Sequence, residues 1–159
     1  MKNIINFRIF YLLITLISIA TILSALYIEH VLNIKPCKLC LYQRYPYLLA
    51  IFLGFLGYCF FNNRILTVLI ILNFSVSFLL GVYHTGIENN IFPEFKGCTT
   101  AGMDLLDKDE LLNSLSIIIP NCKDVTFKLF GLSLATINVL ISLFIIFITI
   151  YLLKNEKNK

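Results

Sequence analysis

Four long runs of apolar residues, separated by polar stretches, dominate this sequence. A bilayer core about 30 Å thick needs roughly 20 residues of α-helix, at about 1.5 Å per residue. The second run is long enough only if its helix begins near Gln43, with Pro46 in the first turn, where proline is tolerated. The pattern therefore predicts an all-α integral membrane protein, a four-transmembrane-helix bundle with helices at about 9–28, 43–61, 65–83 and 132–153.

The four spans predict a single membrane domain, 1–159, with both termini on one side and the two polar connectors, 29–42 and 84–131, on the other. Basic residues at the termini and in the 62–64 turn favour termini inside, because long loops count less in setting orientation. The cysteines of both connectors would then face the exterior, where disulfides persist. Within the long connector, the sequence of residues 104–119 predicts a short helix. We expect this helix either to lie on the membrane surface or to pack on the end of the bundle.

Composition supports the bilayer as solvent. Hydrophobic residues make up 58% of the 159 residues and charged residues only 14%, and the mean hydropathy is +0.86, which is too apolar for a soluble domain of this size. The net charge of +4 is not gathered into a basic face with interleaved aromatics, so nucleic acid is not an expected partner. The first run could pass for a signal peptide, but no small-x-small cleavage site precedes Glu29, and an uncleaved anchor is expected.

A Cys-x-x-Cys pair, Cys37 and Cys40, lies where the first connector approaches the second span. Such a pair closes into a disulfide with little backbone movement, and a nearby arginine such as Arg44 favours the reactive thiolate. If helix 2 has begun by Cys40, Arg44 lies on the same face at i+4, and Cys40 lies near the positive end of the helix dipole. If the helix begins at Pro46, the proximity of Arg44 must be tertiary. The sequence leaves both arrangements open.

The remaining connector cysteines, Cys98 and Cys122, allow other interpretations of the pair. Two structural disulfides are one, and a four-cysteine zinc site is another. A zinc site usually has a second close pair, whereas Cys98 and Cys122 lie 24 positions apart with no histidine near them in the loop. A Cys-x-x-Cys bridge closes a tiny loop and restricts the unfolded chain little. Redox cycling is therefore favoured, and no metal site is expected.

The ordered motifs of the chain resemble one bacterial family, the DsbB family of disulfide bond formation proteins. The resemblance covers nearly the whole chain and rests on Glu29-His30-Val31, Lys35-Pro36-Cys37-x-Leu39-Cys40-x-Tyr42-Gln43-Arg44, Tyr83-His84-Thr85, a lone Cys98, and Cys122 followed by Phe130-Gly131-Leu132-Ser133-Leu134. It implies a thiol oxidase of the bacterial inner membrane, multi-pass with cytoplasmic termini. Such a protein oxidises a periplasmic thioredoxin-fold dithiol oxidase of the DsbA type and passes the electrons to a membrane quinone, ubiquinone or menaquinone.

The resemblance also implies roles for single residues in the first connector and the third span. Cys37 and Cys40 are the quinone-facing pair, with Cys40 the thiolate that engages the quinone ring. Arg44 is the electrostatic partner of Cys40. His84 lies near the quinone and could donate a hydrogen bond to a quinone oxygen; an interfacial histidine satisfied by water or lipid is the alternative.

In the second connector, the resemblance makes Cys98 and Cys122 the mobile-loop pair, and Cys98 forms the mixed disulfide with the DsbA-like partner. Two other hypotheses stay open. Vitamin K epoxide reductases also combine a Cys-x-x-Cys with loop cysteines, but there the Cys-x-x-Cys comes after the loop pair, and here it comes first. A non-catalytic tetraspan adaptor with two structural disulfides would hold cysteines that do not respond to quinone.

Overall fold

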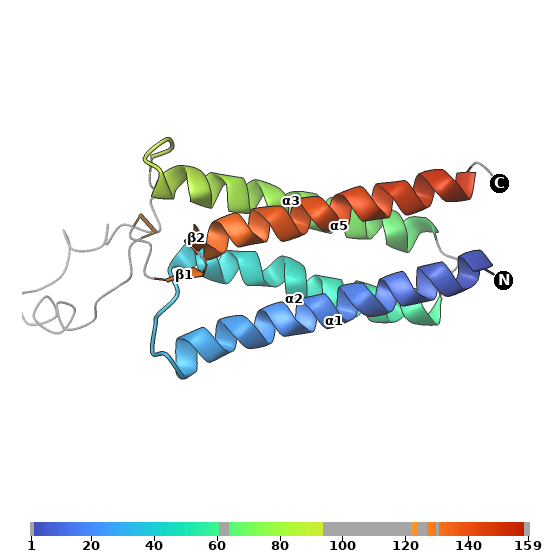
Figure 1. Cartoon of the computed structure of the whole chain (residues 1–159), viewed down its shortest axis with the longest axis horizontal. Coiled ribbons are helices and arrows are strands. Elements are labelled where there is room, and N and C mark those ends of the chain that lie inside the picture. Colours follow the sequence, from blue (N-terminus) through green and yellow to red (C-terminus); the bar gives the residue numbers. More distant parts are fainter. Residues whose placement is uncertain (1, 61–63, 94–121, 124–126, 130, 158–159) are drawn as a thin grey trace, which may run out of the picture.

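The computed structural model places four long helices side by side, with both termini at one end of the bundle (Figure 1). It describes residues 2–60, 64–93, 122–123, 127–129 and 131–157. The elements are α1 (Lys2–His30), α2 (Lys38–Cys59), α3 (Arg64–Glu88), β1 (Lys128–Leu129), β2 (Leu132–Ser133) and α5 (Leu134–Lys157). The predicted helix at 104–119 lies outside the described residues.

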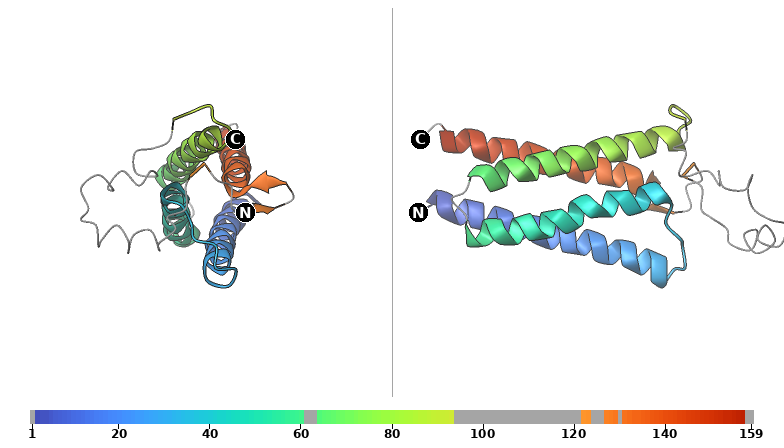
Figure 2. Two further views of the ribbon diagram at one scale, coloured as in Figure 1. Left: turned by 90° about the vertical axis from the view of Figure 1, so that its left-hand side faces the viewer. Right: turned by 180° about the vertical axis from the view of Figure 1, so that it is seen from behind.

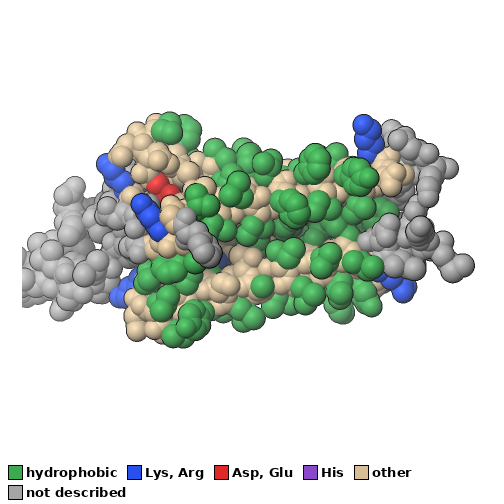
Figure 3. Space-filling model, viewed as in Figure 1, with side chains coloured by type: hydrophobic (Ala, Val, Ile, Leu, Met, Phe, Trp, Pro, Cys, Tyr) green, Lys and Arg blue, Asp and Glu red, His purple; other side chains and the backbone are tan. Residues whose placement is uncertain are grey.

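Each of the four helices is long and apolar enough to cross a membrane. Large apolar side chains cover the middle of the bundle surface, and Lys and Arg side chains lie near its two ends (Figure 3). This distribution is that of a bilayer-spanning protein, because lipid solvates apolar side chains and charged groups seek the interfaces. The chain is therefore a multi-pass membrane protein, and the predicted four-helix bundle is confirmed.

Helix contacts are uneven around the bundle. Extensive contacts join α3 with α5, α1 with α2 and α2 with α3, whereas α1 and α5 meet at few points. In the two side views of the bundle, the His30 end of α1 lies apart from α5 (Figure 1, and Figure 2, right). At the end of the bundle that carries Cys37, Cys40 and Cys122, called the cysteine end below, residues of α1 and α5 line a cavity between them.

The length of the second apolar run predicted a helix that begins near 43. Helix α2 instead begins at Lys38. The reason is the N-cap: Cys37 has an extended backbone, φ −71° and ψ 168°, and its sulfur accepts the backbone N–H of Cys40 at 3.3 Å. A side chain that accepts an N–H of the first turn stabilises a helix start. Pro46 consequently lies inside α2 instead of in its first turn. Helix α3 likewise runs on to Glu88, past the predicted end at 83.

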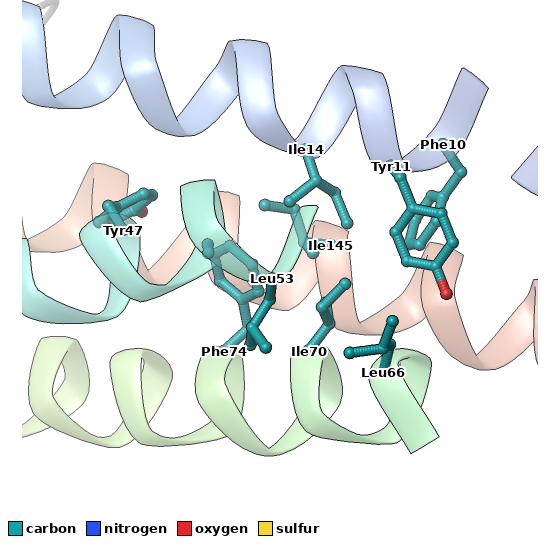
Figure 4. Close-up of a cluster of buried hydrophobic side chains, with 10 residues drawn as sticks. Phe10, Tyr11, Ile14, Tyr47, Leu53, Leu66, Ile70, Phe74 and Ile145 are labelled. Atoms are coloured by element: carbon teal, nitrogen blue, oxygen red, sulfur yellow. The ribbon is translucent and has the colours of Figure 1, made fainter. Parts of the chain in front are cut away.

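The end of the bundle away from the cysteines is closed by a buried apolar core that all four helices share (Figure 4). Tyr11 of α1 is fully buried in it, and its hydroxyl lies 2.7 Å from Thr67 Oγ1 of α3. Helix α2 approaches α1 closely because Gly57 has no Cβ: one added there would collide with the Tyr11 ring. The core therefore fixes the helices at one end and leaves the cysteine end free to form a cavity.

A buried polar network joins α2, α3 and α5 in mid-bundle. Asn138 Oδ1 accepts hydrogen bonds from Tyr47 Oη at 2.6 Å, Ser77 Oγ at 3.1 Å and Ser142 Oγ at 3.3 Å. Asn73 donates from Nδ2 to the carbonyl oxygen of Pro46 at 2.8 Å. Asn73 and Asn138 thus form hydrogen bonds between helices, and these bonds hold α2 against α3 and α5.

A short hairpin leads into α5. Strands β1 and β2 pair antiparallel, with Lys128 opposite Ser133 and Leu129 opposite Leu132. Gly131 in the turn has φ +83°, a conformation that glycine adopts without steric cost. Ser133 Oγ then accepts the backbone N–H of Thr136 at 3.2 Å and caps the start of α5. The hairpin lies at the cysteine end of the bundle (Figure 1).

Candidate active site

Two cysteine sulfurs meet at the start of α2. Cys37 Sγ and Cys40 Sγ lie 3.1 Å apart, and neither is in a disulfide. Cys37 is 6% exposed as the N-cap, whereas Cys40, one turn into the helix, is partly buried. A separation this short lets the pair close into a disulfide with small side-chain rotations.

The surroundings of Cys37 favour its thiolate. Hydrogen bonding with the Cys40 thiol has the largest effect and lowers the pKa of Cys37, burial opposes it, and His84 and the Cys40 backbone N–H lower it further. The net result is a pKa well below the ordinary value for a thiol. Such a cysteine is a good leaving group in thiol–disulfide exchange.

His84 belongs to α3, one turn before its end, and its side chain is 4% exposed. Its Nε2 lies 3.7 Å from Cys37 Sγ and 3.7 Å from Glu88 Oε1. Its Nδ1 lies 3.1 Å from Gln43 Nε2, which is also 3.4 Å from the carbonyl oxygen of Leu80. A carbonyl oxygen can only accept, so this Gln43 atom donates to Leu80 and to His84 Nδ1. Nδ1 is therefore the acceptor nitrogen, and Nε2 carries the hydrogen that faces the sulfur.

Cys37, Cys40 and His84 also converge as three possible metal ligands, with donor atoms within 4.8 Å of one another. The hydrogen bonds and the spacing of these three residues do not fit a metal site. A ligating histidine binds through a bare nitrogen and donates its other N–H to an acceptor, whereas here Gln43 donates to Nδ1. The sulfurs, 3.1 Å apart, are also closer than the separation of about 3.8 Å that two thiolates have on tetrahedral zinc. The cluster is arranged for proton and sulfur chemistry.

Arg44 lies on α2 one turn after Cys40, so the first of the two open arrangements, in which the helix has already begun, is the one found. Its Nη1 forms an ion pair with Glu29 Oε2 at 2.6 Å, with both side chains partly buried. The guanidinium thus pairs with a carboxylate of α1, and Arg44 lines the same cavity as Cys40. The ion pair ties the parted end of α1 to α2.

The second cysteine pair is represented by Cys122, which is disulfide-bonded and 2% exposed. It packs in one buried cluster with Cys37, Leu39 and Ile87, and Cys40 lies against that cluster. Cys98 lies outside the described residues. One cysteine of each connector therefore shares a single buried cluster at the end of the bundle.

A cavity of about 700 Å³ opens beside this cluster. Helices α1 and α5 form apolar walls where they part, for example at Ile22, Ile28 and Ile141. The lining residues near the two cysteine sulfurs include a group of titratable and polar side chains: Lys35, Cys37, Cys40, Gln43, Arg44, His84, Glu88 and Cys122. A largely apolar pocket with a few convergent polar groups is the usual form of a site for a small organic ligand.

Three residues of this site were not predicted from the sequence: Gln43, Glu88 and Glu29 as a charged partner. The i, i+4 spacing of His84 and Glu88 was the available signal, since residues four apart share a helix face. This spacing could not be used because the third helix was predicted to end at 83, which left Glu88 in the connector. Gln43 could be recognised only from the packing of α2 on α3, which brings it to His84 across 41 positions.

Comparisons with known proteins agree with these observations. The sequence matches the family model described as "Disulfide bond formation protein DsbB" over residues 7–152. It is similar to an uncharacterized protein of Rickettsia prowazekii (strain Madrid E), 25% identical over 97% of this chain and 92% of the relative. It is also similar to disulfide bond formation protein B of Psychromonas ingrahamii, at 26% identity over 92% of this chain and 85% of the relative. The same-named protein of Histophilus somni is 29% identical over 70% of this chain and 66% of the relative. With Cys37, Cys40 and Cys122 together at one end of a four-helix membrane bundle and a family match over residues 7–152, the chain belongs to the DsbB family of disulfide bond formation proteins.

Proposed function

We propose that this protein is a membrane thiol oxidase that reoxidises a periplasmic DsbA-like thioredoxin-fold protein and passes the electrons to a membrane quinone. The observation that carries the proposal is the shared burial of Cys37 and Cys122 beside the cavity. A purely structural pair of bridges has no need for a cysteine of one connector to pack on a cysteine of the other. Thiol exchange between two pairs does need it, because the attacking and attacked sulfurs must meet.

The residues present fit a quinone. The cavity volume of about 700 Å³ is that of a small-molecule pocket, and its walls of α1 and α5 are apolar, as an isoprenoid quinone from the bilayer requires. Arg44 and Cys40 line the same pocket. A bound quinone supplies the final oxidation, because it accepts two electrons and two protons and becomes a quinol.

Electron transfer inside the protein follows from the placement of the sulfurs. In the oxidised enzyme, a thiolate of the partner attacks Cys98, the Cys98–Cys122 bond breaks, and Cys122 leaves as a thiolate. Cys122 attacks Cys37 Sγ, the Cys37–Cys40 bond breaks, and Cys40 leaves as a thiolate. The second thiolate of the partner then attacks the partner's own sulfur in the mixed disulfide, and Cys98 is released as a thiolate. Cys98 attacks Cys122, the loop disulfide re-forms, and Cys37 leaves in turn. Two electrons have moved from the partner through the loop pair to Cys37 and Cys40, and no further oxidant is consumed.

This order gives the two sulfurs different roles. Free in the dithiol, Cys37 is the favoured thiolate, because His84 and the Cys40 N–H stabilise it. While Cys37 is bonded to Cys122 it carries no charge, and the negative charge lies on Cys40, which lines the cavity. Cys40 therefore becomes the thiolate that faces the quinone only after Cys37 has formed a disulfide with Cys122.

The proposed setting is the bacterial inner membrane, with the termini in the cytoplasm and the cysteine end in the periplasm. Support comes from the basic residues of the termini and from the common end at which both termini lie (Figure 1). Labelling of single-cysteine variants in intact cells with a membrane-impermeant maleimide tests it: Cys37 must react from the periplasm, and a reporter fused after Lys159 must be cytoplasmic.

The deciding experiment uses the purified protein, a reduced DsbA-like protein, and ubiquinone and menaquinone analogues in separate reactions. Quinol formation is followed by absorbance and partner oxidation by thiol trapping. Cys40→Ser and Cys98→Ser must each abolish quinol formation, whereas Cys59→Ser, a matched change of a free cysteine at the other end of α2, must leave it intact. Partner oxidation that continues without either quinone, or thiols that do not respond to quinone, would refute the proposal in favour of an adaptor.

A further inference from the structure

We infer that Gln43 is a positioning residue that fixes the tautomer of His84, so that His84 always directs an N–H at the sulfur of Cys37. The geometry rests on two contacts of a single amide nitrogen. Gln43 Nε2 lies 3.1 Å from His84 Nδ1 and 3.4 Å from the Leu80 carbonyl oxygen. Gln43 is buried, with 8% exposure, so bulk solvent has little access to these contacts. The part that Cys37 plays in exchange rests on the proposed function, but the tautomer does not.

The other histidine of the chain shows what happens without such a glutamine. His30 near the end of α1 has Nδ1 3.1 Å from the carbonyl oxygen of Leu26, four residues earlier. Because a carbonyl can only accept, His30 carries its hydrogen on Nδ1. Leu80 stands in the same i−4 relation to His84, but its carbonyl oxygen accepts from Gln43 instead. The glutamine therefore takes the place of the imidazole as the donor and reverses the tautomer.

Without the amide N–H, His84 would turn to the pattern of His30. The Leu80 carbonyl oxygen would be free to accept Nδ1–H, and Nε2 would be left without a hydrogen. The Nε2 contact with Cys37, at 3.7 Å, would then change from donor to acceptor. An acceptor beside a sulfur favours the thiol and disfavours the thiolate.

The consequence for the reaction lies in the step that releases the loop. In that step Cys98 attacks Cys122, the Cys122–Cys37 bond breaks, and Cys37 leaves with the electron pair. A leaving thiolate departs faster when its own pKa is lower. The N–H that Gln43 directs through His84 points at that departing sulfur, so loss of Gln43 slows this step and leaves the mixed disulfide to accumulate.

Other charged groups around Cys37 are few among the described residues that line the site. Glu88 of α3 lies 3.7 Å from the same His84 nitrogen, and its carboxylate is a second acceptor beside that N–H. Arg44 of α2 is paired with Glu29 of α1. Lys35, two residues before Cys37, lines the same cavity. Cys40 contributes its thiol and its backbone N–H, and Cys122 is bridged. His84 is thus the donor to Cys37 that a neighbouring side chain can switch.

Nitrogen NMR of histidine-labelled protein tests the tautomer directly. The chain has only 2 histidines, so a His30→Gln variant assigns both spectra. We expect the reduced wild-type protein to show the Nε2–H form for His84 and Nδ1–H for His30, and Gln43→Met to change His84 alone to Nδ1–H. Asn73→Leu, which removes another polar contact between α2 and α3, is the matched control and must leave His84 unchanged. An Nδ1–H form for His84 in the wild type overturns the inference whether or not any variant folds.

A second measurement follows the sulfur. In a protein with Cys40→Ala, Cys59→Ser, Cys98→Ser and Cys122→Ser, Cys37 is the only thiol, and its alkylation rate is measured against pH. Gln43→Met should move the midpoint up by about one pH unit, the size expected for one donor turned away from a thiolate, and Asn73→Leu should not move it. An unmoved midpoint in Gln43→Met refutes the inference. Neither measurement uses quinone or a partner protein, so failure of the proposed function is detected separately.

Discussion

The hydrogen bond between Tyr47 and Asn138 should be measurable as a coupling energy between α2 and α5. The perturbations are Tyr47→Phe, Asn138→Leu and the double variant. Tyr47 Oη donates to Asn138 Oδ1 at 2.6 Å, and both residues are buried. The bond therefore has short, direct geometry in a region without competing water.

The structure sets the expected magnitudes. Interhelical hydrogen bonds in membrane proteins average about 0.6 kcal/mol in double-mutant cycles and reach about 1.7; a short, buried bond belongs in the upper half, so a coupling of roughly 1–1.5 kcal/mol is expected. Asn138→Leu alone should cost more, about 2–3 kcal/mol, because Ser77 also loses its acceptor. Ser142 keeps a partner in Ser77, at 3.0 Å, and limits the loss.

The assay is reversible unfolding in mixed micelles with increasing SDS, followed by tyrosine fluorescence and helical circular dichroism. Thr21→Val is the matched control, because its hydroxyl donates to the i−4 carbonyl of Ile17 within the same helix; it should change the free energy of unfolding by less than about 0.5 kcal/mol. A coupling of zero within error would refute the reasoning, since the two side chains would then be separately and not mutually stabilising.

Three further predictions can be checked with the same preparations. Gly57→Ala should destabilise the protein by about 1–3 kcal/mol in the SDS assay, because the new Cβ collides with the Tyr11 ring, which Thr67 holds in place; a neutral result would show that α1 and α2 can part freely. Arg44→Met should weaken quinone saturation more than Glu29→Gln does, since the guanidinium lines the cavity and Glu29 only pairs with it; the KM for a quinone analogue decides it, and equal effects would assign Arg44 to holding α1. The low pKa of Cys37 gives the reduced protein a stability advantage over Cys37→Ala that is full above the ordinary thiol pKa near 9.0 and is lost as pH falls through the folded-state pKa; SDS unfolding at a series of pH values measures it, and an advantage that grows toward acid would contradict the sign.

Much of the architecture was predictable because it depends on long-range composition. Each apolar run had to cross the bilayer, so the four helices followed, and the Cys-x-x-Cys had to lie at one end of them. The start of α2 was not predictable from apolarity, because its first turn is polar and its signal is a cysteine that acts as N-cap. Cysteine is not among the usual N-cap residues. With the helix predicted to begin near 43, the position of Gln43 and Arg44 relative to the two cysteines was not defined. Glu88 had been assigned to a loop.

Contacts between helices were the second limit. Gln43 and His84 are 41 positions apart, and Arg44 and Glu29 are 15 apart; periodicity gives each helix a face, but not the partner that the face meets. The family resemblance named His84 as a residue near the quinone. In the structure its two ring nitrogens face Gln43 on one side and Cys37 and Glu88 on the other, so the contact with quinone stays a prediction.

The start of α2 explains how two cysteines three residues apart can do different work. Cys37 precedes the helix, and its extended backbone turns the sulfur back over the first turn, where the Cys40 N–H and His84 reach it. Cys40 belongs to the helix, and its sulfur lines the cavity wall. A helix that began at Pro46 would leave both cysteines in one flexible connector, with similar exposure and no fixed donor to either. Both cysteines line the cavity, but Cys37 is a member of the buried cluster that holds Cys122, whereas Cys40 packs against that cluster from the first turn of α2. The division of labour in the proposed relay therefore depends on where a single helix begins.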